Sequence, residues 1–310
     1  MNRVLLIGGG LLGAGLLIVG LIKPDVGSAS EVVSVPAPVF VSAPAAPLPT
    51  IQELRAAHPT TLRIHEPSPQ APGVLTETDG NRVLSYPSGS LWLKGLFRKA
   101  SSQALARGGK FPVLVYLHGG FALDATDVDV CAPFIAAGFS VWAPSYRGED
   151  GNPGDFELFF GELDDARAAI DMAGRLPDAD PERVVVFGHS AGGILAALTA
   201  LYADLPARYT GSAGGLNDTR FFSGMQLPFD DSVQERLMRS FAPFVTQLQK
   251  PHFACAGTSD RGARSVIDPL MARHDLAGVP LEVLLVPGDH FTSLPACMSE
   301  FLSRVQRALN

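Results

Sequence analysis

The fold of this chain is decided by ten residues, Val184-Val185-Val186-Phe187-Gly188-His189-Ser190-Ala191-Gly192-Gly193. A β-branched run leads directly into a G-x-S-x-G sequence, and the alanine- and leucine-rich segment after it is typical of a helix. A strand that turns sharply into a helix at a serine holds that serine in strained geometry at the carboxyl end of the strand. Glycines flank the turn because a β-carbon would clash there. The pattern predicts Ser190 as a nucleophile; without the strand and helix it would indicate only a common turn.

A serine hydroxyl needs a base to take its proton, and the chain has seven histidines. His290 follows the apolar run 281–286 in the loop Pro287-Gly288-Asp289-His290-Phe291. Active sites of parallel sheets collect at the carboxyl ends of strands, so we predict His290 as the base.

An acidic residue must then orient the imidazole, and Asp260 follows the run 252–256 in a loop of the same kind. The chain order Ser190, Asp260, His290 agrees with this assignment. Asp289 and Asp268 are the alternatives, but Asp289 is adjacent to His290 and Asp268 falls on an expected helix.

An oxyanion formed by attack on a carbonyl requires backbone donors. The sequence Leu117-His118-Gly119-Gly120-Phe121 follows the apolar run 113–117, where a second donor loop is expected. We predict the N–H groups of Ala191 and Phe121 as the donors, with Gly120 as the alternative to Phe121.

Short β-type runs alternate with helical patterns along the chain, which predicts an α/β fold with a mostly parallel sheet and helices on both faces. Expected strands are 62–64, 82–86 and 91–97 as an antiparallel opening, then 113–117, 139–143, 184–187, 252–256 and 281–286. Expected helices are 127–137, 162–175, 191–202, 265–277 and 295–309.

Composition narrows the functional class. The chain has 310 residues, a net charge of −7 and no Lys/Arg-rich run, which argues against a nucleic-acid partner. Its cysteines, Cys131, Cys255 and Cys297, are odd in number and widely spaced, so buried thiols are favoured over a single disulfide.

The N-terminal region differs from the rest. Residues 4–22 are apolar and uncharged and would span about 28 Å as a helix, so residues 1–23 are predicted to be a membrane anchor or, alternatively, a cleaved signal. Residues 24–60 read as a Pro/Ala-rich tether and 61–310 as the globular domain, placed outside the cytoplasm by the flanking charges or secreted after cleavage. Gly8, Gly10 and Gly13 match G-x-G-x-x-G, but no second strand follows, which argues against a dinucleotide site.

Together these motifs resemble the α/β-hydrolase superfamily and, more narrowly, the catalytic domain of prolyl-oligopeptidase-type (S9-like) enzymes over roughly residues 83–309. The stretches that carry the resemblance are His118-Gly119-Gly120, Ser145-Tyr146-Arg147-Gly148 with 151–156, Gly161-Glu162-Leu163-Asp164-Asp165-Ala166, Gly188 to Gly193, and the Asp260/His290 tail. The resemblance implies hydrolysis of an ester or amide through an acyl-serine, without metal or cofactor. The region before the domain is too short for the propeller of true oligopeptidases, and the strand expected near 209–213 is weak.

Residues 216–250 contain five phenylalanines and are interpreted as a small cap that forms an apolar acyl pocket, or as aromatics that pack this insertion onto the domain. We therefore expect a membrane-tethered serine hydrolase acting on a small ester or a short peptide, with an ester favoured. A peptidase of the prolyl-oligopeptidase type is the alternative, and a catalytically inactive binding module is the alternative of another class.

Overall fold

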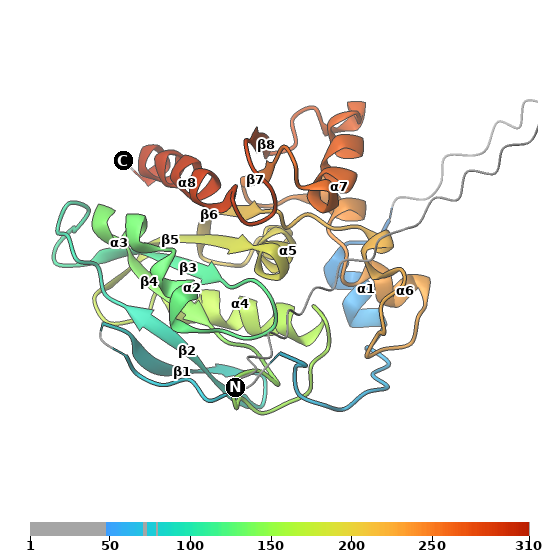
Figure 1. Ribbon diagram of the computed structural model, residues 1–310, viewed down its shortest axis with the longest axis horizontal. Coiled ribbons are helices and arrows are strands. Elements are labelled where there is room, and N and C mark those ends of the chain that lie inside the picture. The colour runs from blue at the N-terminus through green and yellow to red at the C-terminus, as the bar shows by residue number, and fades with distance from the viewer. Residues whose placement is uncertain (1–47, 71–72, 79, 310) are drawn as a thin grey trace, which may run out of the picture. The chain divides into compact units, whose positions relative to one another are not determined.

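A computed structural model describes residues 48–70, 73–78 and 80–309 (Figure 1). The predicted membrane or signal segment, and the tether as far as residue 47, lie outside these residues. Within the described ranges, no helix combines the length and the apolar character that crossing a membrane requires.

One eight-stranded sheet organises the domain, in the order β1-β2-β4-β3-β5-β6-β7-β8. The strands are β1 (Arg82–Ser88), β2 (Leu91–Arg98), β3 (Phe111–Leu117), β4 (Ser140–Pro144), β5 (Ala179–His189), β6 (Ala207–Ala213), β7 (His252–Gly257) and β8 (Leu281–Val286). Strand β2 pairs antiparallel with β1 and β4, and all other neighbours are parallel. The mostly parallel sheet with an antiparallel opening is thus confirmed. The strand at β6, which looked weak in the sequence, is present.

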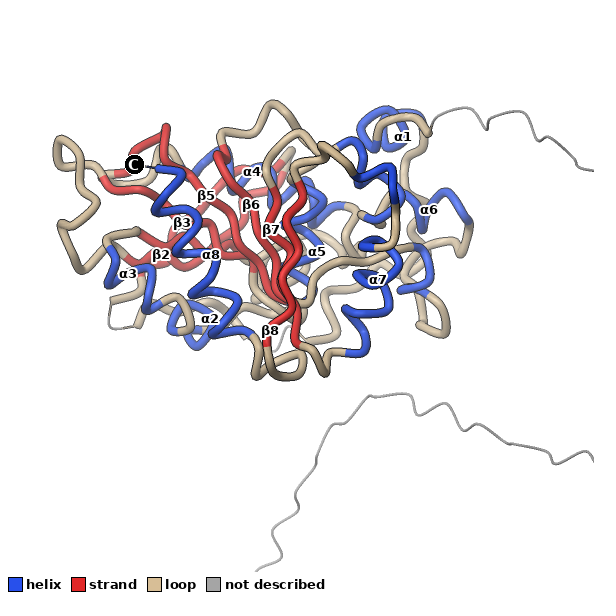
Figure 2. The backbone as a smooth tube through the Cα atoms, turned by 90° about the horizontal axis from the view of Figure 1, so that it is seen from above, coloured by secondary structure: helices blue, strands red, loops and turns tan. Residues whose placement is uncertain are grey.

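Helices cover both faces of the sheet, as predicted (Figure 2). Helices α4 and α5 contact one face, and α2, α3 and α8 contact the other. The bounds are α1 (Ile51–Ala57), α2 (Ala125–Asp129), α3 (Ala132–Ala137), α4 (Gly161–Ala173), α5 (Ser190–Thr199), α6 (Val233–Leu237), α7 (Arg261–Met271) and α8 (Leu294–Leu309). The strands β3, β4 and β7 are buried along their whole length because both of their faces are covered.

Three expected elements differ in the structure. The strand at 62–64 is only an isolated bridge between Leu62 and Phe229. The single helix at 127–137 is broken into α2 and α3 around Cys131. The helix at 265–277 begins earlier, as α7, and ends at Met271, with a short 3-10 turn at His274–Leu276 behind it.

The predicted tether also extended too far, because residues 51–57 form α1 and belong to the domain. Thr50 and Glu53 form a capping box, which stabilises the start of this short helix. Ile51 and Leu54 are buried in the core, and the Gln52 side chain donates to the carbonyl of Leu201 at 2.8 Å. Two apolar residues three apart were the available sequence signal, and the surrounding prolines obscured it.

The insertion at 216–250 is a chain of short helical turns: Thr219–Phe222, α6 and Ala242–Gln247. Four of its phenylalanines are at most 2% exposed and belong to the main core: Phe222, Phe229, Phe241 and Phe244. Only Phe221, 40% exposed, faces outward, and its ring lies 5.9 Å from that of Phe159. The packing interpretation therefore accounts for four of the five, and Phe221 is the one that remains exposed.

Cysteine usage is the clearest correction. Cys255 in β7 and Cys297 in α8 form a disulfide, whereas the sequence favoured buried thiols. Cys131 is a buried free thiol, as expected. The pairing links residues 42 positions apart, so spacing alone gives no sign that the two cysteines meet.

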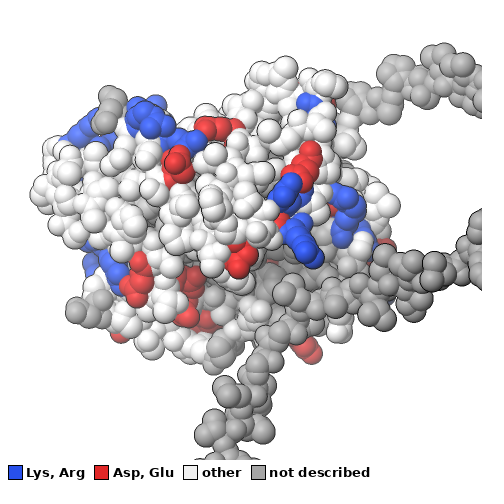
Figure 3. Space-filling view, turned by 45° about the horizontal axis from the view of Figure 1, so that its top comes forward, with Lys and Arg blue, Asp and Glu red and all other residues white. Residues whose placement is uncertain are grey.

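Charged side chains of both signs lie on the face of the domain that Figure 3 shows. Among the described residues of the face in Figure 3, Lys and Arg lie interspersed with Asp and Glu. Most of the acidic and basic groups that pair do so at the surface, where such pairs contribute little to stability.

Candidate active site

Ser190 lies at the sharp turn between β5 and α5, where the flanking positions have no room for a β-carbon. Ser190 has a φ of +54°, a conformation that costs energy for any residue with a β-carbon. A β-carbon on Gly188 would lie 2.1 Å from the carbonyl oxygen of Gly192, and one on Gly192 would lie 2.0 Å from the carbonyl oxygen of Leu117. Only glycine therefore lets α5 start this close to β3, which lifts the Ser190 hydroxyl out at the sheet edge.

The three side chains proposed from the sequence lie in contact. His290 Nε2 lies 2.9 Å from Ser190 Oγ, and His290 Nδ1 lies 2.7 Å from Asp260 Oδ2. The three residues follow β5, β7 and β8, so the sheet brings their loops to one edge. We call Ser190, His290 and Asp260 the triad below. The geometry lets the imidazole accept the serine proton while the carboxylate holds the other ring nitrogen.

Asp260 is fixed in place by a second task. Its Oδ1 accepts the backbone N–H of Ala263 at 3.0 Å, so the same carboxylate caps α7 and faces His290. Burial raises the pKa of this carboxyl, but the hydrogen bonds from His290 and Ala263 outweigh burial and hold the pKa below its usual value. Asp260 is therefore ionised at neutral pH.

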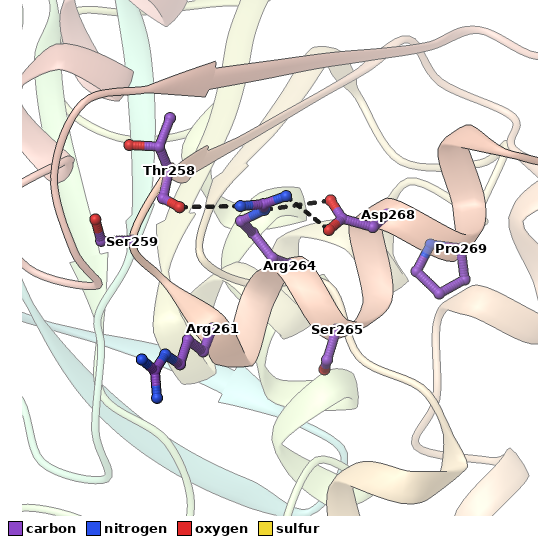
Figure 4. A pocket seen from close by; sticks show the side chains of 7 residues that line it. All are labelled: Thr258, Ser259, Arg261, Arg264, Ser265, Asp268 and Pro269. Carbon is purple, nitrogen blue, oxygen red and sulfur yellow. Dashed lines mark hydrogen bonds and ion pairs between the residues drawn. The ribbon is translucent and has the colours of Figure 1, made fainter.

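The two alternative acids are engaged elsewhere. Asp289 Oδ1 accepts the N–H groups of Phe291 and Thr292 and so closes its own turn. Asp268 binds Arg264 at 2.9 Å, and Arg264 also donates to the carbonyl of Thr258 (Figure 4). These contacts border an open pocket of about 660 Å³ on the outer side of α7, which contains no triad residue. Through Arg264, Asp268 thus holds the loop that contains Asp260, and it lies outside the triad.

The expected oxyanion donors lie next to Ser190, but one of them is occupied. Ala191 is in the first turn of α5, where backbone N–H groups have no acceptor within the helix. The N–H of Phe121 donates to Oε1 of Gln70 at 3.0 Å. The side-chain carbonyl of Gln70 therefore occupies one of the two predicted oxyanion donors. Gly120, the alternative donor, has a φ of +68°, and a β-carbon there would lie 2.9 Å from the same Gln70 oxygen.

Gln70 is held there by a strap, which we define as residues 65–70. Ser68 donates its N–H to the carbonyl of Gly148 and its hydroxyl to the carbonyl of Phe121. The N–H of Phe156 donates to the carbonyl of Glu66 at 2.9 Å. The strap is thereby fastened to the loops that follow β3 and β4, beside Ser190.

A buried ion pair supports the loop after β3, which carries Gly120 and Phe121. His118 Nε2 lies 3.1 Å from Glu149 Oε2, with both side chains at most 1% exposed, and the His118 ring stacks on Tyr146 at 4.9 Å. Burial lowers the pKa of His118, but the Glu149 carboxylate outweighs it and raises that pKa to about 9. His118 is therefore protonated at neutral pH and ties the loop after β3 to the loop after β4.

A model of the alpha/beta hydrolase family matches residues 114–304, more than half of the chain, and this range includes the whole triad. The chain belongs to the alpha/beta hydrolase family. This hydrolase is similar to the uncharacterized peptidase YtmA of Bacillus subtilis (strain 168), with 31% identity over 137 residues. That alignment covers 44% of the hydrolase and 51% of YtmA, so the chain spans about half the length of the curated relative it matches.

Solved structures of peptidases and of esterases share this fold. The acylaminoacyl peptidase of Pyrococcus horikoshii superposes with a TM-score of 0.57 at 19% identity, covering 74% of the hydrolase and 40% of the peptidase. A bacterial heroin esterase superposes with a TM-score of 0.57 at 25% identity, covering 76% of the hydrolase and 86% of the esterase. At such identities the peptidase likeness establishes the fold alone, and the hydrolase fold expected from the sequence is confirmed.

Sequence reasoning missed two residues that contact the loops around the triad. His189 is the first: its Nε2 lies 2.9 Å from the carbonyl oxygen of His290, and its ring lies 5.0 Å from the His290 ring. Burial lowers the pKa of His189, so it is neutral and holds the hydrolase's His290 loop by a hydrogen bond. Its place directly before Ser190 was the only sequence signal. Gln70 carried none, because it lies 51 residues from Phe121.

Across residues 48–70, 73–78 and 80–309, no group of three or more His, Cys, Asp or Glu side chains is arranged to hold a metal ion.

Proposed function

We propose that this alpha/beta hydrolase is a serine hydrolase that cleaves a carboxylic ester, or an amide, through an acyl-serine intermediate. The contact of His290 with both Ser190 Oγ, at 2.9 Å, and Asp260 Oδ2, at 2.7 Å, carries the proposal. A serine hydroxyl becomes a useful nucleophile only when a base accepts its proton, and this arrangement supplies that base.

The reaction proceeds in two balanced halves. Ser190 Oγ forms a bond to the acyl carbon while its proton passes to His290 Nε2, and the Ala191 N–H donates to the resulting oxyanion. The carbon–oxygen or carbon–nitrogen bond to the leaving group then breaks, and His290 returns the proton to that group. Water next attacks the acyl carbon and gives its proton to His290, which passes it to Ser190 Oγ as the carboxylic acid leaves.

An ester is the first substrate class we propose, and a short peptide is the alternative. The alignment with the bacterial heroin esterase spans 86% of that protein, whereas the alignment with the Pyrococcus horikoshii acylaminoacyl peptidase spans 40% of it. The resemblance to YtmA, described as a peptidase, keeps peptides as the second class. Comparing a panel of p-nitrophenyl esters with aminoacyl-nitroanilides tests whether esters are preferred over peptides.

Covalent labelling tests the serine mechanism itself. A fluorophosphonate should form one adduct on Ser190 of the folded chain, and the Ser190→Ala variant should form none. A folded wild-type chain that remains unlabelled would favour the inactive binding module instead.

We further propose that the catalytic domain works outside the cytoplasm, tethered through the N-terminal segment or released after its cleavage. The Cys255–Cys297 disulfide supports this, because such bonds persist in oxidising compartments. Fractionation of cells expressing the full chain, combined with a thiol-alkylation assay, tests it. A cytoplasmic chain with both thiols free would contradict the proposal.

A further inference from the structure

A small cavity lies beside the nucleophile and is not used by the triad. It has a volume of about 10 Å³, enough for one atom group of the size of a water molecule. Phe121 and Ala191, the two predicted oxyanion donors, line it, together with Tyr146, Phe159 and Glu162. The cavity therefore adjoins the place where the acyl carbonyl of a substrate is held.

Two polar atoms at this cavity lack partners. Within the described part of the chain, neither Glu162 Oε2 nor the Tyr146 hydroxyl makes a hydrogen bond, and both residues are 2% exposed. The other oxygen of Glu162, Oε1, accepts the N–H of Glu157 at 2.7 Å, which fixes the orientation of the carboxyl group. Buried polar atoms are almost always paired in proteins, because leaving one unpaired is costly. Two of them lining one cavity indicate a site for a hydrogen-bond donor.

The cations near Glu162 are already committed to other groups. Arg147 binds Asp165 and Glu157, and Arg239 binds Glu235 and the carbonyl of Glu157. Burial raises the pKa of Glu162 to about 8, so the carboxyl group gains a proton or a cationic partner readily near neutral pH. An incoming positive group would favour the ionised carboxylate.

Size and position then select the ligand. A lysine or arginine side chain is far larger than the cavity, whereas an –NH₃⁺ group is close to the size of a water molecule. The α-nitrogen of an aminoacyl group is two bonds from the carbonyl carbon, so it lies next to the oxyanion donors whenever that carbonyl does. We propose that the cavity lined by Glu162 and Tyr146 binds the free α-ammonium group of an aminoacyl substrate. This inference rests on the proposed serine hydrolase function and narrows it to aminoacyl esters or amides.

The test compares two substrates that differ only in that group: alanine methyl ester and methyl propionate. Wild-type kcat/KM should be at least tenfold higher for the alanine ester, because charge-assisted hydrogen bonds are the stronger kind. The ratio of the two kcat/KM values should fall about tenfold or more in Glu162→Gln, which keeps the shape of the side chain, and several-fold in Tyr146→Phe. Asp171→Asn, at an exposed position of the same helix, is the matched control and should keep the wild-type ratio.

The outcomes separate the two proposals. Fluorophosphonate labelling of Ser190 with a ratio near one, or a ratio unchanged in both variants, would mean that the cavity holds only water and would overturn this inference alone. Absence of both labelling and hydrolysis would overturn the serine hydrolase function as well. If Glu162→Gln failed to fold, the wild-type ratio and the Tyr146→Phe variant would still decide.

Discussion

Replacement of Asp260 by Asn tests how the triad carboxylate works. In the wild type, Oδ1 accepts the N–H of Ala263 and Oδ2 faces His290 Nδ1 at 2.7 Å. The Asn side chain has one acceptor and one donor end. Since the Ala263 N–H needs an acceptor, the Asn oxygen should remain at the helix cap and turn the amide NH₂ toward His290. That NH₂ forces Nδ1 to act as an acceptor, which leaves the proton on Nε2, and Nε2 can then no longer accept the proton of Ser190.

The magnitude follows from this tautomer. The same exchange in serine-protease triads lowers kcat by about 10⁴-fold, which corresponds to about 5.5 kcal/mol of transition-state stabilisation. The stability cost should be small, because Asn caps helices about as well as Asp and only the charge near the α7 N-terminus is lost, at about 0.3–1 kcal/mol. The Asp260→Ala variant should lose the cap as well, at about 1 kcal/mol.

The assay is hydrolysis of a p-nitrophenyl ester, with urea unfolding measured on the same samples. Asp289→Asn is the matched control, since Asp289 is adjacent to His290 yet binds only its own turn, and its activity should stay within about twofold of wild type. If Asp260→Asn kept more than a tenth of the wild-type kcat, or if Asp289→Asn lost as much activity, the assignment of Asp260 as the orienting acid would be wrong.

Three further perturbations have defined outcomes. Gln70→Ala removes the side chain that occupies the oxyanion loop N–H, so KM for an ester should fall by about twofold to tenfold, as expected for the net value of one hydrogen bond; an unchanged or higher KM would contradict this role. The pKa of His118 is raised from 6.5 to about 9, so its pair with Glu149 stabilises the fold fully below pH 6.5 and ceases to do so as the pH rises through 9. The wild type should therefore lose up to about 3 kcal/mol of unfolding free energy over that range. Glu149→Gln should flatten the plot of unfolding free energy against pH. Replacing Cys255 and Cys297 by Ser should lower the unfolding free energy by about 4 kcal/mol, the loop-closure value for their separation of 42 residues, and a loss below about 1 kcal/mol in urea unfolding would refute that reasoning.

The sequence predicted the parts of the site that are formed by contiguous residues or that directly follow a strand. A β-branched run, a glycine-flanked serine and a helix are contiguous at Ser190, so one stretch of chain both indicates the fold and suggests Ser190 as the nucleophile. Asp260 and His290 could be proposed because each follows an apolar run that reads as a buried strand, and parallel strands end at one edge of the sheet.

The features that sequence could not predict are formed by residues far apart in the chain. Gln70 meets Phe121 because the strap crosses the loops after β3 and β4, and no periodicity encodes that crossing. Helix α1 is a single capped pair of turns whose stability comes from tertiary packing, which propensity does not report. The pattern of phenylalanines in the insertion is equally typical of a pocket wall and of core packing, and only their burial in the folded chain distinguishes the two.

The disulfide covalently encloses the loops that carry two members of the triad. The closed ring from Cys255 to Cys297 contains two members of the triad, Asp260 and His290. A single proteolytic cut in the loop between α7 and β8 would thus leave both halves of the ring joined to the same molecule. We expect such a nicked chain to migrate as one species until a reductant is added, and to release a C-terminal fragment carrying the imidazole only then.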